Sequence, residues 1–62
     1  MPAQRAGGRL APLEVIYYNI GVNFVSAGLA EDGVLCFTKA VALDPRYVDG
    51  YYQRALAYLK LG

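Results

Sequence analysis

The feature that most constrains this chain is a match of the sequence to itself at an offset of 34 residues. Three pairs are identical at that offset: Tyr17 and Tyr51, Tyr18 and Tyr52, Gly28 and Gly62. Five pairs are conservative: Gly21 and Ala55, Asn19 and Gln53, Val22 and Leu56, Phe24 and Tyr58, Val25 and Leu59. When copies of one local structure follow each other along a chain, each copy stacks on its neighbours and buries its apolar face against them.

The spacing of apolar residues predicts an all-α chain with helices over about residues 13–27, 29–43 and 48–61. Pro12 and Glu14 suit the beginning of the first helix, and Gly28 suits its end in a left-handed conformation. Asp44 before Pro45 ends the second helix. Because one or two residues join the first two helices, they are expected to lie antiparallel, as a hairpin.

Each helix is expected to pack through one face. The face of the first helix comprises Tyr17, Ile20, Gly21, Phe24 and Ala27. The face of the second comprises Ala30, Gly33, Val34, Phe37, Ala40 and Val41. The face of the third comprises Tyr51, Arg54, Ala55, Tyr58 and Leu61.

The period and the residue pattern together resemble the tetratricopeptide repeat (TPR) family, whose unit is a helical hairpin of 34 residues. The residues that carry the resemblance are Tyr17, Ile20, Gly21, Phe24, Gly33, Phe37, Ala40 and Pro45. The resemblance implies an alpha-alpha superhelix. It divides the chain into a flexible tail or linker over 1–13, a first repeat over 14–47 and the first helix of a second, truncated repeat over 48–62.

The resemblance also implies a protein–protein interaction module, a scaffold or adaptor, because the first helix of each repeat in this family lines a concave groove. The expected groove residues are mostly apolar: Val15, Tyr18, Val22, Val25, Tyr52, Leu56 and Leu59. One subclass of the family grips acidic chaperone tails with Lys and Asn. This chain has Tyr18, Val22 and Gln53 at the matching positions, so that ligand is disfavoured.

Other classes of function find little support in the composition. The sequence has no His and a single cysteine, Cys36, so we expect no enzyme, no cofactor and no metal site. The net charge of +1 gives no footprint for nucleic acid. The uncharged stretch 15–30 is too short to span a membrane and contains two Asn residues. With no targeting signal, cytoplasm is the default location.

The hydrophobic content of 56% is high for a chain of 62 residues. A third helix without a following neighbour leaves Tyr51, Tyr58 and Leu61 uncovered, and we expect this face to support self-association. The isolated chain is therefore not expected to be a stable monomer. Two alternatives to a binding module stay open: a structural oligomerisation element, or a fragment of a longer TPR protein with no ligand of its own.

Overall fold

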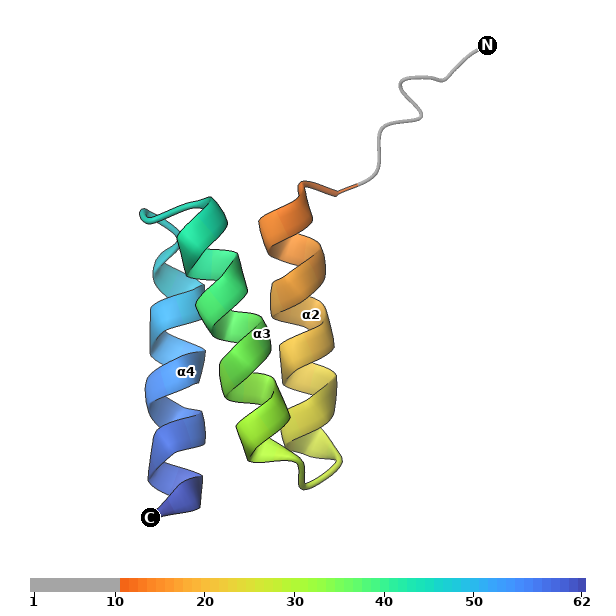
Figure 1. Cartoon of the computed structure of the whole chain (residues 1–62), viewed down its shortest axis with the longest axis vertical. Coiled ribbons are helices and arrows are strands. Elements are labelled where there is room, and N and C mark those ends of the chain that lie inside the picture. Colours follow the sequence, from red (N-terminus) through yellow and green to blue (C-terminus); the bar gives the residue numbers. More distant parts are fainter. Residues whose placement is uncertain (1–10) are drawn as a thin grey trace, which may run out of the picture.

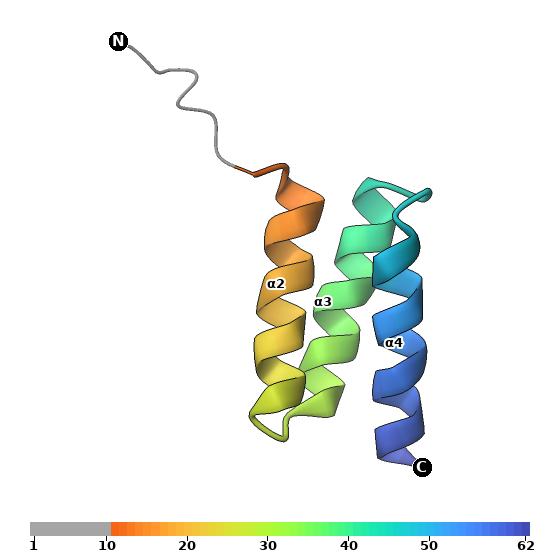
Figure 2. The same cartoon turned by 180° about the vertical axis from the view of Figure 1, so that it is seen from behind.

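The computed structural model describes residues 11–62 and contains three helices: α2 (Leu13–Ser26), α3 (Ala30–Leu43) and α4 (Val48–Leu61). The helices lie side by side with α3 in the middle, in both the front and the back view (Figures 1 and 2). Their directions alternate, so α2 and α4 run the same way, as two copies of one unit should. The predicted all-α hairpin fold is confirmed.

The helix bounds differ from the expected ones by one residue, at the end of α2 and at the beginning of α3. Leu13, expected both as the end of the tail and as the beginning of the first helix, is the first residue of α2. Residues 1–10 of the expected tail lie outside the part of the chain that the structure describes.

The turn between α2 and α3 is built on Gly28, whose φ is +84°. The Leu29 amide donates a hydrogen bond to the Phe24 carbonyl at 2.8 Å, and the Gly28 amide donates to the Val25 carbonyl at 3.0 Å. These two bonds form a Schellman motif, which satisfies carbonyls at the helix end and reverses the chain. The motif needs a left-handed residue, and glycine adopts that conformation without steric cost.

The connection between α3 and α4 depends on Asp44, whose backbone is extended at φ −137°. Its carboxylate Oδ1 accepts a hydrogen bond from the Arg46 amide at 3.1 Å. Its carbonyl accepts a second bond from the Tyr47 amide at 3.0 Å. Because Pro45 excludes helical geometry at the residue before it, α3 stops here and the chain turns into α4.

The core is small and lies along α3. Among the described residues, the buried apolar side chains are Phe37, Ala40, Val41 and Ala57. Phe37 is fully buried, and Gly21 lets the backbone of α2 approach its ring closely, while Gly50 lets α4 approach Val41. A Cβ atom at Gly21 would lie 2.6 Å from the Phe37 ring, and one at Gly50 would lie 2.8 Å from the Val41 side chain.

Two residues of α2 do not lie where the periodicity placed them, and on α4 the expected packing residue Ala55 is exposed while Gly50 and Ala57 are buried instead. Ile20 is 42% exposed and Ala27 is exposed, although both were expected on the packing face of α2. The reason is geometric: α3 covers a narrow strip of α2 centred on Gly21, and Ile20 projects about 100° away from that strip. Tyr17 and Phe24, at the margin of the strip, are half-buried.

Replacement of Gly21 by Ala is expected to lower the free energy of unfolding by about 1 kcal/mol. The clash with the Phe37 ring costs about 2 kcal/mol, and about 1 kcal/mol of this cost is offset because Ala has a higher helix propensity than Gly. Circular dichroism melts measure the change. In a Phe37→Leu background, where the ring is absent, the same replacement should be neutral or stabilising. An equal loss in both backgrounds would show that the ring contact is not the cause.

Candidate protein-interaction surface

The expected groove residues of α2 are largely used for packing within the chain. The ring of Tyr18 lies 5.8 Å from the ring of Phe37, measured between centroids. It lies 5.5 Å from the ring of Tyr47, in an edge-on arrangement. Tyr18 therefore joins α2 both to the core and to the segment that leads into α4. Offset and edge-on aromatic pairs of this kind stabilise a fold beyond the area they bury.

Val25 is the second α2 residue with a structural role. One of its methyl groups would lie only 2.5 Å from a Cβ atom at Gly33, so it occupies the space that this glycine leaves open. Val15 and Val22 are half-buried. The α2 half of the expected groove is thus a partly covered surface.

The matching residues of α4 are open to solvent. Tyr52 is 62% exposed, Leu59 is 77% exposed and Leu56 is 37% exposed. Val48, which the sequence reasoning did not single out, is 72% exposed on the same helix. Val48 precedes Tyr52 by four residues, which places both on one side of a helix, and this spacing could have identified Val48 from the sequence. Most of the accessible apolar surface at the expected site therefore belongs to α4.

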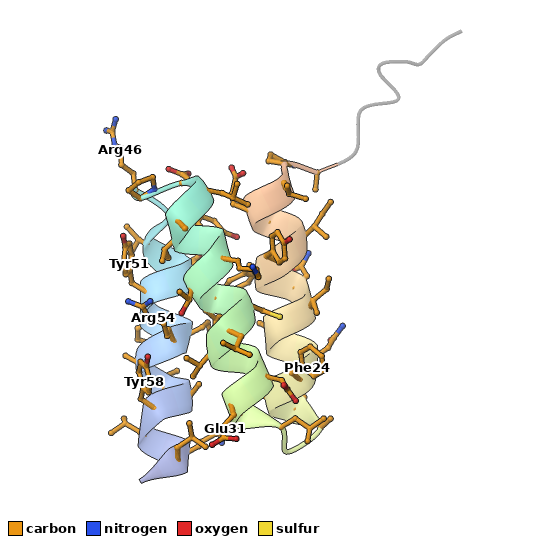
Figure 3. The ribbon with its side chains drawn as sticks, viewed as in Figure 1. Phe24, Glu31, Arg46, Tyr51, Arg54 and Tyr58 are labelled. Carbon is orange, nitrogen blue, oxygen red and sulfur yellow. The ribbon has the colours of Figure 1, made fainter. Side chains whose placement is uncertain are left out.

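A second exposed face of α4 carries Tyr51, Tyr58 and Leu61, which are 42%, 53% and 47% exposed. Tyr51, Arg54 and Tyr58 follow one edge of the helix (Figure 3). The Arg54 guanidinium lies 5.6 Å from the centroid of the Tyr51 ring and donates a hydrogen bond to the Thr38 hydroxyl on α3 at 3.2 Å. Arg54 thus connects the Tyr51 end of this face to α3.

A hollow of about 240 Å³ lies between the beginning of α2 and the end of α3. Its lining residues are Leu13, Tyr17, Lys39, Ala42 and Leu43. This volume is below the usual range for small-molecule sites, about 300–1,000 Å³. Lys39 is the only charged group in the lining.

Within residues 11–62, two titratable groups have shifted pKa values. Burial, and next the charge of Asp32, raises the pKa of the Cys36 thiol, while Lys39 lowers it by a smaller amount. Burial beside Tyr18, together with nearby carboxylates, raises the pKa of Tyr47. Both shifts favour the neutral form, which is the opposite of what a nucleophile requires.

Two features are absent from residues 11–62. No group of three or more His, Cys, Asp or Glu side chains is placed to hold a metal ion there. No helix in that range has the length and apolar character needed to cross a membrane.

The two tyrosines related by the repeat should respond differently to truncation. Tyr18→Ala is expected to lower the free energy of unfolding by about 2 kcal/mol, because it removes two aromatic contacts in a half-buried site. Tyr52→Ala, the matched control, should change it by no more than about 0.5 kcal/mol. Denaturant titrations of both variants measure the difference, and equal losses would contradict the packing role of Tyr18.

The Cys36 thiol should react slowly with iodoacetamide at neutral pH, because its raised pKa leaves little thiolate. Asp32→Asn removes a negative charge that disfavours the thiolate, so alkylation should become faster. Lys39→Gln removes a favourable positive charge, so alkylation should become slower. Rates measured against pH report the pKa directly, and opposite directions for the two variants would refute this electrostatic account.

Comparison with known proteins gives the family. The sequence profile of the TPR repeat matches residues 24–62. Tetratricopeptide repeat protein 16 of Homo sapiens and that of Macaca fascicularis are each 44% identical over 55 residues. The match covers 87% of this chain and 6% of each relative, so the chain spans a small part of their length. No solved structure matches significantly. The profile spans more than half of the chain, which therefore belongs to the tetratricopeptide repeat family, a family of protein-interaction modules.

Proposed function

We propose that this chain binds a segment of another protein or peptide through an apolar face of α4, with α2 forming the adjoining wall. The single observation that carries the proposal is the exposure of Tyr52 and Leu59, at 62% and 77%. Isolated apolar residues at a surface are ordinary, but several at helical spacing on one helix are typical of an interaction site.

The chemistry of the face suggests the character of its ligand. Tyr52 combines a large apolar ring with a hydroxyl, as anchor residues of interfaces commonly do. Asp49 and Lys60 are exposed at opposite ends of α4. An apolar segment with one positive and one negative group suits this distribution better than an acidic tail does.

The role we propose is non-enzymatic. Its support is the lack of histidine in the sequence and the neutral state that burial favours for Cys36 and Tyr47. The division into a tail, one repeat and the first helix of a second repeat forms part of the same proposal, and so does a cytoplasmic location.

A second candidate is self-association through the face of Tyr51, Tyr58 and Leu61. Its support is that all three side chains are at least 42% exposed. Arg54 counts against a purely apolar interface here, because its guanidinium lies over the Tyr51 ring and would have to be buried with it.

Peptides selected on the chain from a displayed random 12-residue library test the groove. Tyr52→Ser and Leu56→Ser should each weaken the selected peptides by tenfold or more, since interface anchors of this kind contribute about 1–2 kcal/mol. Tyr58→Ser, on the other exposed face, is the matched control and should leave affinity unchanged. Fluorescence anisotropy measures the affinities. Loss of binding only in the control variant would assign binding to the other face.

A further inference from the structure

We draw no further inference here: the strongest candidate, the hollow between the beginning of α2 and the end of α3 that Leu13, Tyr17 and Leu43 help to line, carries no proposal because nothing in the structure shows what covers it.

Discussion

The close approach of α2 to α3 at Gly21 and Phe37 is the constraint on which the rest of the structure depends. No side chain separates the α2 backbone from the Phe37 ring, so the ring is fully buried in a core that otherwise consists of small residues. The same arrangement recurs on the other side of α3, where Gly50 meets Val41. A helix pair held this closely can bury one aromatic ring completely even in a chain of this length.

The two copies of the repeated helix have the same pattern and different surroundings. Tyr18 is enclosed by Phe37 and by Tyr47, which precedes the next helix. Tyr52, its counterpart at the offset of 34 residues, is 62% exposed. Tyr18 lies against residues of α3 and of the connection to α4, both of which follow α2 in the chain. Within residues 11–62 most of the exposed large apolar side chains lie on α4, and the proposed function concerns that helix.

The sides of α4 differ in their surroundings. Gly50 and Ala57 are buried, as the contacts with α3 require. The edge with Tyr51 and Tyr58 carries a guanidinium that is already engaged with Thr38. The far side carries the exposed apolar side chains of Val48, Tyr52 and Leu59, and one charged group of each sign lies nearby.

The order, type and ends of the three helices followed from the sequence, because local signals set them: the spacing of apolar residues, glycine at a left-handed turn, and proline after Asp44. The family followed as well, since the period and the small residues at helix crossings are visible without coordinates. Only the tertiary structure decided which apolar residues are available to a partner. Periodicity placed Ile20 on the packing face and Tyr18 on the groove face and did not single out Val48, but exposure depends on how wide a strip each neighbouring helix covers. The packing leaves Ile20 and Val48 open and encloses Tyr18.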